Sequence, residues 1–260
     1  MTTNPAWDPQ LYLAFADERA RPFRDLLARV PRHDALSVVD LGCGPGQLTP
    51  LVRQTFPDAD VVGVDASGEM IDRARADDPA TEYVLADVAG WTPPAPVDAI
   101  VSNAMFQWLP DRLDVIRRLA GHVTPGGVFA LQVPSNGASP SHRLMFEIAG
   151  REPYAEHTAS AVDRFFVDGP EVYLELFAEL GWTVDAWSTT YLHVLPGDDA
   201  VFHWVSGTGA RPVLQSLPEG PVRDRYVADY QAALREAFPQ RPWGTVLPFR
   251  RTFAVARRPD

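Results

Sequence analysis

Three glycines at alternate positions, Gly42, Gly44 and Gly46, follow a short apolar run that ends in Asp40-Leu41. Such a run predicts a buried strand that enters a tight turn and then a helix. Because glycine has no Cβ, the turn can adopt positive φ and its backbone can approach a ligand, while the helix begins with free N–H groups. We therefore predict a ligand site at this turn; the alternative is a glycine-rich turn that binds nothing.

The spacing of these glycines distinguishes two classes of cofactor site. The dinucleotide fingerprint G-x-G-x-x-G has its third glycine five residues after the first, and Gln47 occupies that position here. An NAD-dependent dehydrogenase therefore fits poorly. The pattern D-x-G-x-G-x-G resembles motif I of the class I S-adenosylmethionine (AdoMet) methyltransferases. This resemblance implies AdoMet as the cofactor, bound by Asp40, Gly42, Gly44 and Gly46.

Polar side chains close four predicted strands: Asp40, Asp65, Asp87 and Asn103. Open α/β sheets bind ligands outside the carboxyl ends of their strands, so we expect all four at the cofactor. Asp65 lies 19 residues after Gly46, where a carboxylate usually accepts from ribose hydroxyls. Asp87 is placed to accept from the exocyclic amine of adenine. Ser67 is expected to cap a helix whose Met70 contacts the adenine.

The elements that must position these residues alternate as strands and helices. Predicted strands cover residues 59–65, 83–88, 97–104, 128–133, 183–195 and 249–257, with a turn at 124–127, and predicted helices cover 23–30, 48–56, 111–120, 141–149 and 170–180. The fold class is α/β, and the resemblance implies a Rossmann-like, mostly parallel sheet of seven strands with an antiparallel edge strand.

We predict one methyltransferase domain over residues 1–260, divided into a helical lid (1–31), a cofactor-binding core (32–133), a connecting helical region (134–182) and C-terminal strands (183–260). A mainly helical insertion at 198–238 is placed to roof the pocket. Tyr12 and Phe15, three residues apart, share one helical face that belongs either to the core or to the lid.

Composition narrows the classes of function. A net charge of −11 and a pI of about 4.9 argue against a surface for nucleic acid. No apolar run reaches the roughly 18 residues of a membrane helix, and the first residues lack an apolar signal region, so we expect a cytoplasmic protein with no membrane partner. Cys43 is the only cysteine, which excludes a cysteine-based metal cluster; it is a small residue in the turn or, alternatively, a nucleophile. We predict no metal site.

A closer resemblance extends almost end to end. The chain is similar to the trans-aconitate 2-methyltransferase family in Leu11-Tyr12-Leu13, Glu18-Arg19, Arg21-Pro22, the glycine turn, Asn103-Ala104, Gln107-Trp108-Leu109-Pro110-Asp111, Thr189-Thr190-Tyr191, Trp204-Val205, Thr208-Gly209, Arg211-Pro212 and Phe253-Ala254-Val255-Ala256-Arg257-Arg258. The resemblance implies methylation of a small polycarboxylate. It departs at Met105-Phe106, beside the expected methyl site, and over residues 135–163.

A carboxylate substrate requires little acid–base chemistry. It is already ionised at pH 7, so it attacks the sulfonium methyl in one in-line displacement, and we assign no catalytic acid or base. The remaining carboxylates need cations, for which forked arginines are suited. We predict a substrate site of Tyr191, His193, Trp204, Arg211 and Arg251, and a cofactor site completed by Tyr12, Arg19 and Val88.

Three alternatives stay open. The chain can methylate another small carboxylic acid or a hydroxyl, for which His193 is a candidate general base. It can bind AdoMet as a regulator without catalysis. Each arginine, finally, can be a solvated surface charge rather than part of a clamp. The oligomeric state does not follow from the sequence.

Overall fold

The computed structural model describes residues 16–31, 34–162 and 168–260, with the backbone alone for 16–19 and 162. The chain divides into two compact units. The sheet unit contains Asp17–Pro134, Asp168–Thr189 and Arg251–Asp260; the helical unit contains the described parts of Ser135–Val167 and Thr190–Arg250.

A seven-stranded sheet has the order β3-β2-β1-β4-β5-β7-β6. The strands are β1 (Ser37–Leu41), β2 (Asp60–Asp65), β3 (Glu82–Leu85), β4 (Val97–Asn103), β5 (Val123–Pro134), β6 (Thr183–Leu195) and β7 (Thr245–Arg257). Strands β1 to β5 pair in parallel, and β7 pairs antiparallel to β5. The predicted fold class, mostly parallel with an antiparallel addition at one side, is confirmed.

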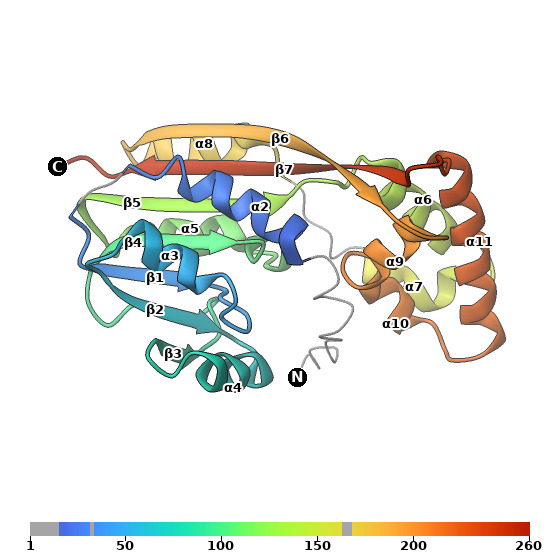
Figure 1. Ribbon diagram of the computed structural model, residues 1–260, viewed down its shortest axis with the longest axis horizontal. Helices are drawn as coiled ribbons and strands as arrows, with labels where there is room; N and C mark the ends of the chain where they lie inside the picture. Colours follow the sequence, from blue (N-terminus) through green and yellow to red (C-terminus); the bar gives the residue numbers. More distant parts are fainter. Residues whose placement is uncertain (1–15, 32–33, 163–167) are drawn as a thin grey trace. The chain divides into compact units, whose positions relative to one another are not determined.

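Helices cover both faces of the sheet unit. They are α2 (Ala16–Leu27), α3 (Thr49–Thr55), α4 (Gly68–Asp77), the 3-10 turn η1 (Phe106–Trp108), α5 (Arg112–Ala120) and α8 (Pro170–Glu179). In Figure 1, α2 and α3 lie in front of the sheet, and α5 and α8 lie behind it. Helix α5 buries Val115, Ile116 and Leu119 at helical spacing, and Phe129 of β5 packs against Phe177 of α8 at 5.4 Å between ring centroids.

The strand register aligns the carboxyl ends of the parallel strands. Asp65 pairs with Leu85, Leu41 with Ser102, and Asn103 with Gln132. Because these strands run in one direction, the residues that follow them collect along one edge of the sheet. The fold thereby places the ends of β1 to β4, and the residues that directly follow them, on that edge.

Two strand boundaries differ from the sequence-based expectation. β3 ends at Leu85, since the Asp87 carbonyl accepts from Gly90 and Trp91 N–H and turns the chain away. Asp87 is therefore an exposed loop residue and does not close a strand. The predicted turn at 124–127 lies inside β5, where the pairing with β4 shifts register and Gly126 has φ of +75°.

The helical unit contains α6 (Pro140–Ala149), α7 (Ala155–Val162), α9 (Ala200–Ser206), α10 (Arg211–Ser216) and α11 (Pro221–Ala237). The tyrosines of α11 fasten it to α6: the hydroxyls of Tyr226 and Tyr230 donate to the carbonyls of Met145 and Ser141 at 3.1 and 2.8 Å. Helices α9, α10 and α11 lie within residues 198–238, the segment expected to be mainly helical, whereas α7 was not predicted. None of the helices that the structure describes is long and apolar enough to cross a membrane.

Candidate active site

The three glycines of the turn all adopt positive φ, as predicted, but for different reasons. A Cβ on Gly42 would lie 2.5 Å from Cβ of Met105, and one on Gly46 would lie 2.6 Å from Oη of Tyr83. Neighbouring side chains thus exclude larger residues at both positions. A Cβ on Gly44 would have no atom within 4 Å, so Gly44 is the glycine whose backbone faces open space. Of the three, it best fits close approach by a ligand.

The carboxylate of Asp65 holds the turn in place. Its Oδ2 accepts from Gly44 N–H at 3.0 Å, and its Oδ1 accepts from Ser67 N–H at 2.9 Å. The N–H groups of Gly42 and Cys43 both donate to the carbonyl of Val64, at 2.8 and 3.1 Å. A carboxylate has about four acceptor positions, so Asp65 can hold the backbone and still accept from a ligand hydroxyl.

Asp40 lies inside β1 with only 2% of its surface exposed. Its Oδ2 accepts from Thr49 Oγ1 at 2.7 Å. Burial raises the pKa of Asp40 to about 6, and the charge of Asp65 adds to the rise, while the Thr49 hydroxyl opposes it. Asp40 therefore acts on the turn through its charge and its bond to Thr49 at the start of α3.

The loop after β3 presents two hydrogen-bonding groups to the sheet edge. Asp87 Oδ1 accepts from Ala89 N–H at 3.0 Å, whereas Oδ2 has no donor among the described residues. The N–H of Val88 likewise has no acceptor in the described part of the chain, although its side chain is buried. Met70 is half-buried in α4, and the predicted cap is confirmed: Met70 N–H donates to Ser67 Oγ at 3.4 Å.

A chain of polar groups links the end of β4 to β7. Nε2 of Gln132 donates to Oδ1 of Asn103, and Nη1 of Arg251 contacts Oε1 of Gln132 at 3.5 Å. Arg251 is only 6% exposed, so the alternative of a solvated surface charge is wrong for this residue. The structure thus joins a predicted cofactor residue, Asn103, to a predicted substrate residue through one amide.

The other predicted substrate residues belong to the helical unit. Tyr191, His193 and Trp204 are buried and stacked, with 4.6 Å between the His193 and Trp204 rings and 6.4 Å between those of His193 and Tyr191. Arg211 begins α10 and is half-buried.

Two residues of the predicted cofactor site cannot be placed in the same way. Tyr12 lies outside the described residues, and so does the predicted partner of its helical face, Phe15. Arg19 lies in α2, where its backbone is described and its side chain is not.

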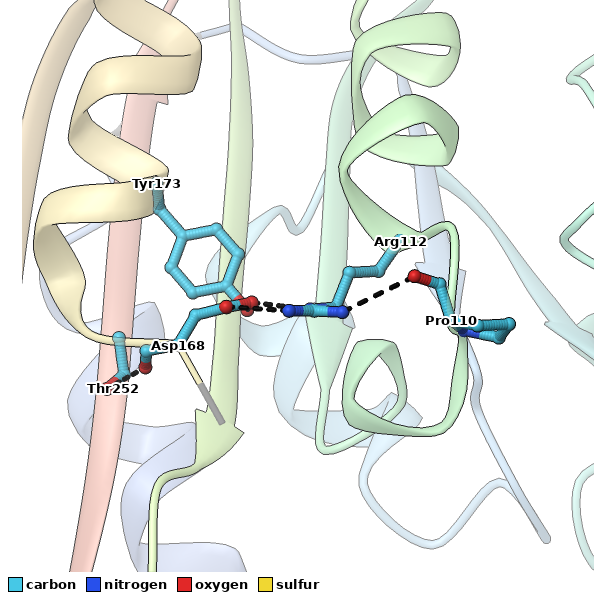
Figure 2. A network of polar contacts seen from close by, with 5 residues as sticks. All are labelled: Pro110, Arg112, Asp168, Tyr173 and Thr252. Carbon is cyan, nitrogen blue, oxygen red and sulfur yellow. Dashed lines mark hydrogen bonds and ion pairs between the residues drawn. The ribbon is translucent and has the colours of Figure 1, made fainter. Parts of the chain in front are cut away.

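A buried ion pair fixes the loop that follows β4 (Figure 2). Arg112 Nη2 donates to Asp168 Oδ1 at 2.6 Å, its Nε donates to Oδ2, and the two side chains are 12% and 11% exposed. Tyr173 donates to the same carboxylate at 3.3 Å, and Thr252 donates to the Asp168 carbonyl at 3.1 Å. Nη1 of Arg112 also contacts the carbonyl of Pro110 at 3.5 Å, so the pair holds loop, α5, α8 and β7 together.

The comparisons with known proteins agree with this geometry. A family model described as a methyltransferase domain matches residues 38–127. A trans-aconitate 2-methyltransferase of Streptomyces coelicolor is 47% identical over 268 residues, covering 99% of this chain and 88% of that protein. A trans-aconitate 2-methyltransferase of Azoarcus sp. is 47% identical over 255 residues, covering 98% of this chain and 100% of that protein. The chain belongs to the trans-aconitate 2-methyltransferase family.

A solved structure supports the fold of this trans-aconitate 2-methyltransferase family member. The plantazolicin methyltransferase BpumL, crystallised with a desmethylPZN analog and SAH, has a TM-score of 0.54 at 12% identity, covering 97% of this chain and 92% of that one. The predicted family and its enzyme class, an AdoMet-dependent methyltransferase, are confirmed.

Sequence reasoning missed several residues that shape the site of this family member. Gln132 carried a signal, because it is a lone polar residue in the apolar run 128–133 beside the end of β4. Asp168 and Arg112 are 56 residues apart and carry no such signal. The bond of Thr49 to Asp40 and the position of Tyr83 beside Gly46 depend on how α3 and β3 pack in the folded chain.

The raised pKa of Asp40 predicts a pH-dependent stability. The folded state binds the proton of Asp40 more tightly than the unfolded state does. The resulting stabilisation of the folded state is complete below about pH 4 and is lost as the pH rises through about 6. Asp40→Asn keeps an acceptor for Thr49 and does not titrate. In urea unfolding, we expect the stability of the variant minus that of the wild type to rise by about 2 kcal/mol from about pH 4.5 to 7.5. A difference independent of pH would contradict the assignment.

The Arg112–Asp168 pair predicts a large loss of stability when one partner is neutralised. Asp168→Asn leaves a buried guanidinium without its counter-ion, so the free energy of unfolding should fall by about 3–5 kcal/mol. Glu179→Gln is the matched control, because it breaks the exposed Arg117–Glu179 pair, which also starts from α5, and should cost less than about 1 kcal/mol. Chemical denaturation of both variants checks this, and equal losses would contradict it.

Proposed function

We propose that the protein transfers a methyl group from AdoMet to a carboxylate of a small polycarboxylic acid, with trans-aconitate as the substrate. The observation that carries the proposal is the set of hydrogen-bonding groups gathered by the parallel strands at one sheet edge, in a chain of this family. The glycine turn, Asp65, Asp87 and Asn103 all follow or end strands there. This edge is where open α/β sheets bind their ligands.

The groups at the edge complement the parts of AdoMet one by one. Adenine presents a donor, its exocyclic amine, beside an acceptor, N1. Asp87 Oδ2 supplies an acceptor and Val88 N–H a donor in adjacent positions along the chain. The remaining acceptor positions of Asp65 suit the ribose hydroxyls, and the open face of Gly44 suits close approach. Met70 is retained as an adenine contact.

In this reaction the protein has to position the substrate against the cofactor and exclude water from the nucleophile. It does not have to transfer a proton. When bound, AdoMet would supply a sulfonium methyl, whose carbon the substrate carboxylate attacks in line while the C–S bond breaks, to give a methyl ester and S-adenosylhomocysteine (SAH) as the leaving group. The nucleophile is ionised at pH 7 without a base. The turn and Asp65 hold the cofactor, and the polar chain from Asn103 to Arg251 orders the adjacent strand ends. Placement of the substrate carboxylate at attack distance from the methyl group, with water excluded, accounts for the acceleration of the reaction.

Arg251 is the cation that we assign to a substrate carboxylate not being methylated. Its guanidinium is buried, so an anion beside it is attracted in a medium that screens charge poorly. Its planar fork matches a carboxylate at two points. Tyr191, His193, Trp204 and Arg211 remain substrate residues by resemblance to the family. A cytoplasmic location and the division of residues 1–260 into lid, core and roof belong to the same proposal.

A substrate panel tests the function. With labelled AdoMet, we expect methyl transfer to trans-aconitate to exceed transfer to cis-aconitate, isocitrate and longer alkyl dicarboxylates in kcat/KM. The product should be a methyl ester, from which mild base releases the label as methanol. Turnover of a hydroxyl substrate alone would assign a different acceptor, and SAH binding without turnover of any acid would favour the regulator. Either result would overturn the proposal.

Arg251→Ala should lower kcat/KM for the polycarboxylate by about 10- to 150-fold, the value of a hydrogen bond to a charged group. Arg251→Lys should recover part of this loss, because it keeps the charge without the fork. SAH affinity by calorimetry should stay nearly constant in both. Arg250→Ala changes the exposed neighbour and is the control. Unaltered kinetics in a folded Arg251→Ala variant would place the clamp elsewhere.

A further inference from the structure

We propose that Arg118 is a positioning residue for the cofactor, which fixes the loop from Asp87 to Trp91 so that this loop recognises the 6-amino group of adenine. Nη2 of Arg118 donates to the carbonyls of Val88 and Ala89 at 2.8 and 2.9 Å, and Nη1 donates to the carbonyl of Trp91 at 2.5 Å. One side chain thus binds three carbonyls of a five-residue loop. The inference rests on the proposed role of Asp87 and Val88.

The guanidinium is held in place by the helix that carries it. Arg118 lies on α5 between Ile116 and Leu119, which are fully buried, and is itself half-buried. Its planar fork has donors at fixed angles, so the three carbonyls are bound in one arrangement. Through Arg118, the position of the loop is therefore fixed relative to the core of the sheet unit.

The loop's own hydrogen bonds set its shape, and the buried side chain of Val88 packs it against the core. Its internal bonds all return to Asp87: the carbonyl accepts from Gly90 and Trp91 N–H, and Oδ1 accepts from Ala89 N–H. These bonds shape the turn but do not fix its position on the sheet. The three bonds from Arg118 fix the backbone carbonyls of the loop relative to α5, and one of them binds the carbonyl of Val88, the residue whose N–H we assign to adenine.

Loss of Arg118 should therefore weaken binding of the adenine edge and leave binding of the rest of the ligand unchanged. The spacing between Asp87 Oδ2 and Val88 N–H determines whether an amine and N1 are bound together, and a loosened loop must be ordered again at each binding event. The ribose contact at Asp65 lies on β2 and does not pass through this loop. The expected signature is a loss of selectivity for the 6-amino group.

The experiment compares two ligands by calorimetry on the full chain. One is SAH, and the other is its purine analogue, which lacks only the 6-amino group and keeps N1. The wild type should bind SAH at least about tenfold more tightly, and Asp87→Ala should abolish this preference. Arg118→Met should reduce the preference to within about twofold. Arg118→Lys should restore only part of it, because an ammonium can donate to the loop but cannot span three carbonyls.

Arg117→Met is the matched control. Arg117 is the neighbouring residue on α5, is exposed and pairs with Glu179 at 2.6 Å, so its loss should leave the preference unchanged. A folded Arg118→Met variant that keeps the wild-type preference would overturn the inference, and so would an equal loss for both ligands, which is the mark of a general folding role. Should Arg118→Met not fold, the preference of Arg118→Lys decides between the same outcomes.

The two proposals fail in different ways. A wild type without preference, or a preference that survives Asp87→Ala, would remove Asp87 from the adenine site and the inference with it. A preference lost in Asp87→Ala and kept in Arg118→Met would overturn the role of Arg118 alone. Methyl transfer to trans-aconitate is measured separately and is independent of both results.

Discussion

The hydrogen bond from Gly44 N–H to the Asp65 carboxylate is the interaction on which the rest of the site depends. It joins the turn after β1 to the residue that ends β2, and the N–H groups of Gly42 and Cys43 reinforce it at the carbonyl of Val64. The turn needs positive φ to make these bonds, so the backbone, the acid at the strand end and the parallel register are selected together. The carboxylate therefore has a structural role before any ligand binds.

Most of the fold followed from patterns that are local in the chain. Residues 183–195 and 170–180 were identified almost to the residue, because periodicity and helix-start signals are carried by neighbours. Local patterns failed where pairing decides a boundary. β3 stops at Leu85 because Asp87 bonds its own loop, and β5 continues through a glycine pair because β4 still pairs with it across a register shift.

The site shows the same division between local and distant information. The types and positions of Asp40 and Asp65 could be predicted, since each lies at or near the end of a strand beside a glycine turn. Their partners could not. Arg118 meets its loop across about thirty residues, and Asp168 meets Arg112 across 56, so only the packing of α5 reveals either contact. The burial of Arg251, one of 23 arginines, is likewise invisible in its spacing.

Tyr83 has a consequence for how this sequence can change over time. Its hydroxyl occupies the space of a Cβ on Gly46, and its ring lies 2.5 Å from the position of a Cβ on Gly63. One side chain on β3 thus excludes any residue larger than glycine at two positions that are 17 residues apart in the chain. Because Gly63 has no positive φ, a smaller residue at 83 would remove the main clash with an alanine there and leave a close contact of 3.0 Å with Cys43 Sγ, whereas Gly46 would still meet backbone strain. Substitutions must therefore arise in order, with position 83 changing before position 63, and the reverse order passes through a clash.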